Sequence, residues 1–209
     1  MLIRKRSIIV FQGDSVTDAG RREPSNSSGL GAGYPALCAG VLRSLFPDYE
    51  LTVYNRGFGG NCVGDLTERW QQDTLDLKPT LVSLLIGIND SCPQEGVSFD
   101  ILAFEADLVR IVEQTVHCGA KLVILEPFAF HHGSFPEERR ERLWQIQQVV
   151  RRVALRYADA FIPLDGLFYR AAIRPDGTSA AQSLSADGVH PTIDGHRLIA
   201  REWLETVLR

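Results

Sequence analysis

The sequence contains no long apolar run, no pair of closely spaced cysteines and no low-complexity segment, and each absence excludes a class of protein. Its apolar stretches fall well short of the roughly 20 residues that a transmembrane helix needs, so we expect no membrane partner. The cysteines include no C-x-x-C pair, which disfavours a zinc ribbon or a thioredoxin-like redox site. We expect them to be reduced thiols of a cytoplasmic protein. They are Cys38, Cys62, Cys92 and Cys118.

An excess of positive charge is also missing. The chain has 22 lysines and arginines against 26 aspartates and glutamates, a formal net charge of -4 at pH 7. Its short basic runs are RKR at 4–6 and ERRER at 138–142, and the second is interleaved with glutamate. This balance argues against a nucleic-acid partner. The first run precedes SIIVF as in a signal peptide, but the apolar run is too short and no small-residue cleavage site follows, so we expect no targeting segment.

What is present is an ordinary globular composition. The 209 residues are 44% hydrophobic and 23% charged, which is enough apolar material for a sizeable core. A chain of this length is long for a minimal domain and short for two, and it shows no internal repeat or linker. The sequence therefore predicts a single domain over residues 1–209.

Short apolar runs alternate along the chain with longer segments of helical period. Runs that are apolar on both faces are typical of a parallel sheet that helices cover on both sides. The predicted strands are 7–12, 51–55, 80–87, 121–127 and 160–164. The predicted helices are about 34–46, 63–75, 99–118, 136–158 and 191–208, and irregular stretches are expected at 25–33 and 174–188. This order predicts an α/β protein, with three layers (α/β/α) around a central five-stranded parallel sheet.

Four polar, glycine-bearing loops stand where a site of such a fold would lie. GDSVTD follows the first predicted strand, NRGFGGN the second and GINDS the third, and DGVHP precedes the last helix. Ligands bind to open parallel sheets beyond the carboxyl ends of the strands. The four loops therefore predict one shared site.

The residue types in these loops are those of a hydrolase with a serine nucleophile. Ser15 lies on a sharp turn after a strand. Asp187 and His190 are three residues apart, so the carboxylate can bond one ring nitrogen while the other faces a hydroxyl. The Ser15 amide, an amide of a glycine in GFGGN and the side chain of Asn89 could together stabilise an oxyanion. These neutral donors suit a negative charge that exists only during the reaction.

In this order and with these separations, the four motifs resemble the signature blocks of the SGNH (GDSL-type) hydrolases. The segments GDSVTDAGRREP, GLGAGYPA, RWQQDTLDLKPTLVSLLIGIND and GVHPTIDGHRLIARE extend the resemblance to the intracellular bacterial acetylxylan esterases of that superfamily. The resemblance implies a flavodoxin-like fold and a serine esterase that removes small acyl groups, acetyl above all, from xylo-oligosaccharides or related sugars. It implies Ser15 as nucleophile, His190 as base and Asp187 as its orienting partner, with an acyl-Ser15 intermediate and no metal or other cofactor.

The same resemblance implies that the oxyanion donors are the amides of Ser15 and Gly60 and the side chain of Asn89. Gly60 is preferred to Gly59 because the glycine of the family comes five residues after an asparagine such as Asn55. Three positions depart from the family pattern. They are Gly59, where serine is common, Cys62, where threonine is common, and Ala186, where the acetylxylan esterases carry tryptophan.

Other residues near the motifs have structural as well as functional interpretations. We expect Asp14 to brace the Ser15 turn through hydrogen bonds, and Asp18 to be an ordinary turn former. Phe128 and His131 follow the fourth predicted strand, at the same edge as the site. They could line a substrate pocket, or they could be a core side chain and a loop residue.

The sequence leaves several functions open beside a sugar acetylesterase. A short-chain thioesterase, an arylesterase or a lysophospholipase would use the same site, although no apolar lid favours long-chain lipids and no G-x-S-x-G elbow favours an α/β-hydrolase lipase. A metal-dependent phosphoesterase is disfavoured, because carboxylate and histidine ligands are too few and Ser15 would be unexplained. A non-catalytic sugar-binding protein stays an alternative, and a helix face could bury against a second copy of the chain to form a homo-oligomer.

Overall fold

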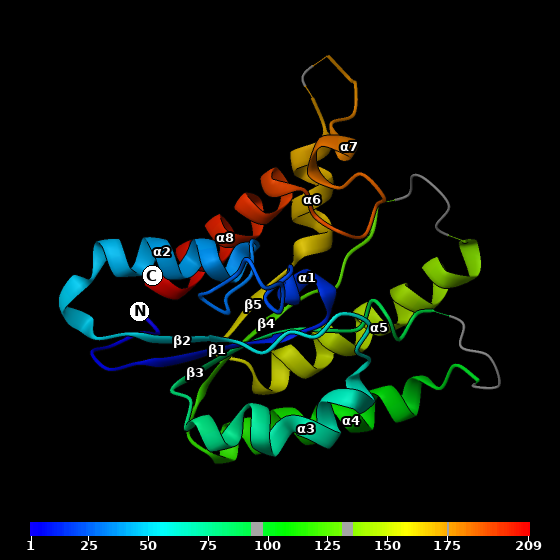
Figure 1. Ribbon diagram of the computed structural model, residues 1–209. Coiled ribbons are helices and arrows are strands. Elements are labelled where there is room, and N and C mark those ends of the chain that lie inside the picture. The colour runs from blue at the N-terminus through cyan, green and yellow to red at the C-terminus, as the bar shows by residue number, and fades with distance from the viewer. Residues whose placement is uncertain (93–97, 131–135, 175) are drawn as a thin grey trace.

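A five-stranded parallel sheet forms the centre of the computed structural model, which describes residues 1–92, 98–130, 136–174 and 176–209 (Figure 1). The strands are β1 (Ile8–Gly13), β2 (Thr52–Asn55), β3 (Leu81–Leu85), β4 (Lys121–Leu125) and β5 (Ala160–Ile162). Their spatial order is β2-β1-β3-β4-β5, and each neighbouring pair is parallel. This is the flavodoxin-like order, so the predicted fold class is confirmed.

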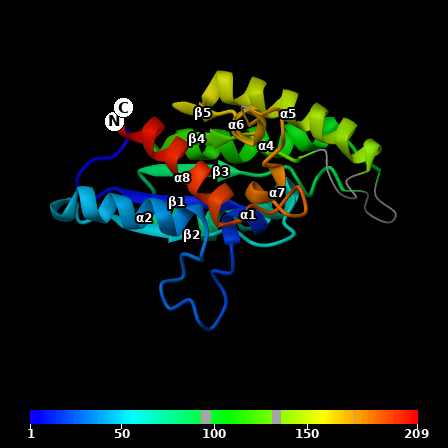
Figure 2. The same ribbon diagram turned by 90° about the horizontal axis from the view of Figure 1, so that it is seen from above.

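Helices cover both faces of the sheet (Figures 1 and 2). One face carries α2 (Tyr34–Leu45), α6 (Leu164–Ala172) and α8 (Ile193–Leu208). The other carries α3 (Val63–Asp73), α4 (Ile101–His117) and α5 (Glu137–Tyr157). Shorter turns are α1 (Ser15–Asp18), α7 (Ala181–Leu184), η1 (Pro47–Tyr49) and η2 (Leu75–Leu77). None of the helices in the described ranges is long and apolar enough to cross a membrane.

The strands are apolar on both faces because each face packs into a separate core. In β3, Leu81 and Leu85 join the cluster beneath α2 and α8. Val82 and Leu84 point the other way, into the cluster beneath α3, α4 and α5. All five residues of β3 are buried. Burial of this kind stabilises the fold by about 25 cal/mol for each Å² of apolar surface removed from water.

Helix α6 corrects the predicted end of the fifth strand. The apolar run at 160–164 predicts a strand up to Leu164, but β5 ends at Ile162 and Leu164 is the first residue of α6. Leu164, Phe168 and Ala172 are all buried. Their four-residue spacing places them on one face of a helix, which packs into the core beneath α2 and α8. The irregular stretch predicted at 174–188 likewise contains the single turn α7.

The fold brings the polar loops to one edge of the sheet. After β1 the chain continues to β2 on one side, and after β2 it crosses to β3 on the other side of β1. A crevice forms at such a switch point, beyond the carboxyl ends of the two central strands. α1 follows β1 at this edge, and Figure 2 shows the loop after α7 at the same edge.

Candidate active site

The turn after β1 presents Ser15 at the start of a one-turn helix. Asp14 caps α1, since its Oδ1 accepts a hydrogen bond from the N–H of Val16 at 2.9 Å. Gly13 has a φ of +154°, and a Cβ there would lie 2.1 Å from the carbonyl oxygen of Leu85 on β3. The turn therefore requires glycine at this position. Its tightness leaves the Ser15 hydroxyl at the edge of the sheet.

Ser15, His190 and Asp187 form a hydrogen-bonded chain, although 175 positions separate the first two. Ser15 Oγ lies 2.9 Å from His190 Nε2, and His190 Nδ1 lies 2.6 Å from Asp187 Oδ2. The other oxygen, Oδ1 of Asp187, accepts from the backbone N–H groups of Val189 at 2.9 Å and His190 at 2.7 Å. One carboxylate thus holds both the loop and the imidazole. A proton on Nδ1 leaves Nε2 as an acceptor for the serine hydroxyl.

Asp187 keeps its negative charge over the whole neutral and mildly acidic range. Burial acts to raise its pKa, but hydrogen bonds from the His190 ring and from the N–H groups of Val189 and His190 outweigh burial and lower it to about 2. The side chain is 54% exposed, so solvent also reaches the carboxylate. An ionised Asp187 favours the tautomer with a proton on Nδ1 and can stabilise an imidazolium.

The two candidate glycines after β2 differ in what their amides do. The N–H of Gly59 donates to Asp18 Oδ2 at 3.0 Å, so Asp18 already holds that donor. Gly60 has a φ of +87°, in the left-handed region, and a Cβ there would meet nothing within 4 Å. The space beside Gly60 is therefore open to a ligand. This difference favours Gly60 over Gly59 as the oxyanion donor, and the role of Gly60 stays a prediction.

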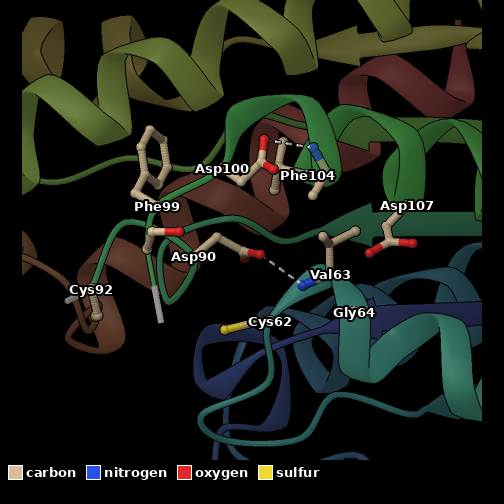
Figure 3. Close-up of a pocket in the computed structure, with 11 residues that line it drawn as sticks. Cys62, Val63, Gly64, Asp90, Cys92, Phe99, Asp100, Phe104 and Asp107 are labelled. Atoms are coloured by element: carbon tan, nitrogen blue, oxygen red, sulfur yellow. Dashed lines mark hydrogen bonds between the residues drawn. The ribbon is translucent and has the colours of Figure 1, made fainter. Parts of the chain in front are cut away.

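Two hydrogen bonds fasten the loop after β3 to the loop after β2. Asn89 Nδ2 donates to the carbonyl oxygen of Asn61 at 3.0 Å. The next residue, Asp90, accepts at Oδ1 from the N–H of Val63 at 3.0 Å, and Figure 3 shows this carboxylate directed at the start of α3. Asn89 and Gly60 therefore lie on segments that are fixed relative to each other.

Asp18 is a site residue that the sequence does not reveal, since its local pattern predicts only a turn. It is 6% exposed, and its Oδ1 accepts from the N–H of Arg21 at 3.1 Å. Its Oδ2 accepts from the Gly59 amide and from Arg22 Nη2 at 3.3 Å. Asp18 thereby joins α1 to the loop after β2. Gly59 lies 41 positions further along the chain, so no local signal could have indicated this role.

Of the two predicted pocket residues, Phe128 and His131, the structure describes only Phe128 and places it in the core. Phe128 is 3% exposed and stacks on Phe168 of α6 with ring centroids 3.8 Å apart. It is a core side chain that presents little surface to a substrate. His131 lies outside the described residues. Within the described part of the chain, no group of three or more histidine, cysteine, aspartate or glutamate side chains could hold a metal ion.

Two further carboxylates lie beside the site, Asp14 buried and Asp90 partly buried. Burial raises the pKa of Asp14 to about 7 and that of Asp90 to about 6. Asp90 also lines a hollow of about 250 Å³ together with Asp100 and Asp107 (Figure 3). In the described structure its Oδ2 is buried without a hydrogen-bond partner. Both residues therefore favour the protonated form more than an exposed aspartate does.

The raised pKa of Asp14 predicts a pH-dependent cost to stability. From pH 4 to pH 7 the native state holds the Asp14 proton more tightly than the unfolded chain, so this residue lowers the free energy of unfolding as the pH rises through that window. Asp14→Asn keeps the oxygen that caps α1 but does not ionise. We expect the free energy of unfolding of the variant, minus that of the wild type, to increase from pH 4 to pH 7.

Urea denaturation of both proteins at pH values across this window measures the difference. Taking the difference cancels the contributions of the other titrating groups. A difference that stays constant with pH would contradict the assignment of a raised pKa to Asp14.

Comparisons with known proteins agree on one family. The model of the GDSL-like lipase/acylhydrolase family matches residues 11–198. The acetylxylan esterase of Geobacillus stearothermophilus is 31% identical over 208 residues, which cover 95% of this chain and 93% of that protein. The crystal structure of Axe2, an acetylxylan esterase from the same organism, has a TM-score of 0.85 at 30% identity and is matched over 99% of this chain and 96% of that chain.

Two further results bear on the site and the fold. Structures described as catalytic mutants of Axe2, in which a serine, an aspartate or a histidine is replaced by alanine, also match. A putative GDSL-like lipase from Parabacteroides merdae has a TM-score of 0.87 at 31% identity and is matched over 98% of this chain and 97% of that chain.

Proposed function

Because the chain belongs to the GDSL-like lipase/acylhydrolase family, as its four motifs predict, we propose that it is a serine esterase that removes acetyl groups from xylo-oligosaccharides or related sugars. Membership makes it a carboxylic ester hydrolase. The observation that carries the proposal is the hydrogen-bonded chain from Ser15 through His190 to Asp187. The catalytic mutants of Axe2 alter the same three residue types, which supports these roles.

Acylation begins when His190 Nε2 takes the proton of the Ser15 hydroxyl as Oγ attacks the ester carbonyl. Their separation of 2.9 Å is within reach for direct proton transfer. The resulting imidazolium is stabilised by Asp187, which stays ionised. His190 then gives its proton to the oxygen of the leaving sugar as the carbon–oxygen bond breaks. Acetyl-Ser15 and a free sugar hydroxyl are the products of this half-reaction.

Deacylation repeats the sequence with water as the nucleophile. His190 Nε2 takes a proton from a water molecule that attacks the acetyl carbonyl. The proton returns to Ser15 Oγ as the acyl–oxygen bond breaks and acetate leaves. Ser15, His190 and water account for every proton transferred and every bond formed or broken in both half-reactions. We therefore propose that no metal or organic cofactor takes part.

The negative charge on the carbonyl oxygen forms only in the tetrahedral intermediates. We assign its stabilisation to the amides of Ser15 and Gly60 and to Asn89 Nδ2. The bond from Asn89 to the carbonyl of Asn61 fixes the orientation of the amide group and uses one of its two N–H donors, which leaves the other for the oxyanion. Such preorganised donors each contribute about 2.7–4 kcal/mol to lowering a barrier of this kind.

We further propose that residues 1–209 act as one domain in the cytoplasm on a small acylated sugar, without a nucleic-acid partner. The four cysteines all lie in the described ranges, and none of them forms a disulfide there, which supports a reducing compartment. The formal net charge of -4 supports the absence of nucleic-acid binding.

The experiment that tests this function is a substrate comparison with the wild-type protein. It measures kcat/KM for an acetylated xylo-oligosaccharide, a short-chain acyl-CoA, a lysophospholipid and an aryl acetate, each divided by its uncatalysed hydrolysis rate. We expect this normalised kcat/KM to be at least about tenfold higher for the acetylated sugar than for the thioester and the lysophospholipid. A factor of ten is a difference of about 1.4 kcal/mol in transition-state binding.

Two other outcomes would change the assignment. Hydrolysis of the aryl acetate without acetate release from any sugar would keep the esterase and discard the sugar substrate. A faster normalised rate on the thioester or the lysophospholipid would replace the sugar with that substrate.

A further inference from the structure

A polar groove leads away from the nucleophile along the loop that follows α1. A hollow of about 220 Å³ is lined by Ser15, Asp18, Ala19, Gly20, Arg22 and Glu23. A second hollow of about 410 Å³ shares three of these residues, Ala19, Gly20 and Glu23, and continues to Ser25, Asn26, Ser27, Ser28 and Ala32. We call the two together the Ser15 groove. Figure 2 shows the loop that carries most of it projecting from the body of the protein beside α1.

The lining of the Ser15 groove does not suit two of the alternative substrates. Its described lining residues include no aliphatic side chain larger than alanine, so it offers no binding surface to a long acyl chain. Its charged side chains are Arg22, Asp18 and Glu23, with a net charge of about -1, which does not favour the phosphates of an acyl-CoA. The remaining side chains are mainly hydroxyls and an amide. They suit a neutral ligand with many hydroxyl groups.

Arg22 is held in place at the rim of the groove. Its guanidinium carbon lies 3.8 Å from the centroid of the Phe58 ring, and its Nη2 donates to Asp18 Oδ2 at 3.3 Å. The side chain is nevertheless 51% exposed. A guanidinium has five N–H donors in a rigid plane. A donor group that is already ordered loses little conformational entropy when it binds a hydroxyl.

The site also lacks an aromatic side chain at the position of the family tryptophan. Ala186 is exposed and immediately precedes Asp187. A methyl group gives a sugar ring much less contact area than an indole. We therefore look for binding energy for further sugar units on another surface next to Ser15. The Ser15 groove is continuous with the nucleophile.

We propose that the Ser15 groove binds the sugar units that neighbour the acetylated unit of an oligosaccharide. Arg22 and Asn26 donate hydrogen bonds to sugar hydroxyls in this arrangement, and Glu23 accepts them. The inference rests on the proposed function, because it places the sugar chain relative to a deacetylation at Ser15.

The test combines chain length with a change in the groove. Wild-type protein and the double variant Glu23→Ala/Asn26→Ala are compared on acetylated xylotriose, acetylated xylose and an aryl acetate. Wild type should show a higher kcat/KM on acetylated xylotriose than on acetylated xylose. In the double variant, kcat/KM on acetylated xylotriose should fall by roughly tenfold, the effect of one or two hydrogen bonds. Its kcat/KM on acetylated xylose and on the aryl acetate should stay within about twofold of wild type.

Trp144→Ala is the matched control. Trp144 is 60% exposed and lines a different hollow, of about 350 Å³, that shares no lining residue with the Ser15 groove. We expect this variant to behave as wild type on all three substrates. The proposal would be overturned if kcat/KM on acetylated xylotriose alone fell in Trp144→Ala and did not fall in the double variant. That result would place the sugar chain on α5.

The remaining outcomes separate this inference from the proposed function. Deacetylation of sugars with equal kcat/KM on xylose and xylotriose overturns the groove and keeps the function. An equal loss on all three substrates in the double variant also overturns it, since the loop would then act by supporting Ser15. No release from either sugar, with hydrolysis of the aryl acetate intact, defeats the proposed function itself.

Discussion

Replacing Ser15 by alanine should lower kcat for acetate release by about 10⁴- to 10⁶-fold, the scale on which loss of a triad nucleophile acts. The variant keeps the oxyanion donors and the groove but has no Oγ to form the acyl intermediate. His190→Ala should cost a similar factor, because a serine hydroxyl without its base is a weak nucleophile. The two losses should not add in the double variant, since the residues act as a unit.

Single-turnover release of acetate from an acetylated xylo-oligosaccharide measures these effects, and a fluorophosphonate probe that labels Ser15 in the wild type checks the nucleophile directly. Ser44→Ala is a matched control, because Ser44 is an exposed serine on α2 away from the site. A Ser15→Ala variant within tenfold of wild-type kcat would remove the acyl-enzyme mechanism. Absence of both activity and labelling in the wild type would favour the sugar-binding alternative.

Asp187→Asn should lower kcat by about 10⁴-fold while leaving the fold intact. The amide oxygen of asparagine can still accept from the backbone N–H groups of Val189 and His190. Its NH₂ group, however, would donate to His190 Nδ1, so the ring proton would move to Nε2. The nitrogen that faces Ser15 would then be a donor and could not take the serine proton.

The control for this prediction is Asp194→Asn, which changes an exposed carboxylate paired with Arg197 on α8. Thermal unfolding should show both variants close to wild type, since each carboxylate is more than half exposed. Esterase activity should fall only in Asp187→Asn. Equal turnover in Asp187→Asn and wild type would show that Asp187 does not orient the base.

The sequence predicts the sheet well because its strands are buried on both faces. A continuous apolar run bounded by glycine or polar residues leaves few alternatives in β1, β3 and β4, and the observed ends differ from the predicted ones by about one or two residues. Such a run does not distinguish a strand from the start of a buried helix, which explains why Leu164 is placed wrongly. The spacing of Leu164, Phe168 and Ala172 contains the signal for α6, but it begins inside the run.

Some features of the candidate site can likewise be predicted from the sequence and others cannot. Ser15, Asp187 and His190 can be predicted to meet, because the loop after the first strand and the loop before the last helix both lie at the carboxyl edge of a parallel sheet. The hydrogen bond from the Gly59 amide to Asp18 cannot be predicted, because it depends on how two loops approach each other in space. His196 is a second example. The sequence places it within the last predicted helix and gives no sign of its burial. In the structure its Nδ1 accepts from the N–H of Tyr34 at 3.2 Å, and burial followed by repulsion from His190 lowers its pKa to about 4.

The distance along the chain between Ser15 and His190 has a consequence for how activity first arises. The His190 loop is anchored by α8, whose buried Trp203 donates to Ser83 Oγ on β3 at 3.0 Å. At ribosomal speeds of about 5–20 residues per second, the 175 positions between serine and histidine correspond to roughly 9–35 s of synthesis. A nascent chain therefore carries its serine for most of its synthesis without the base that activates it. Recovery of esterase activity during refolding would accordingly report the docking of the final helix.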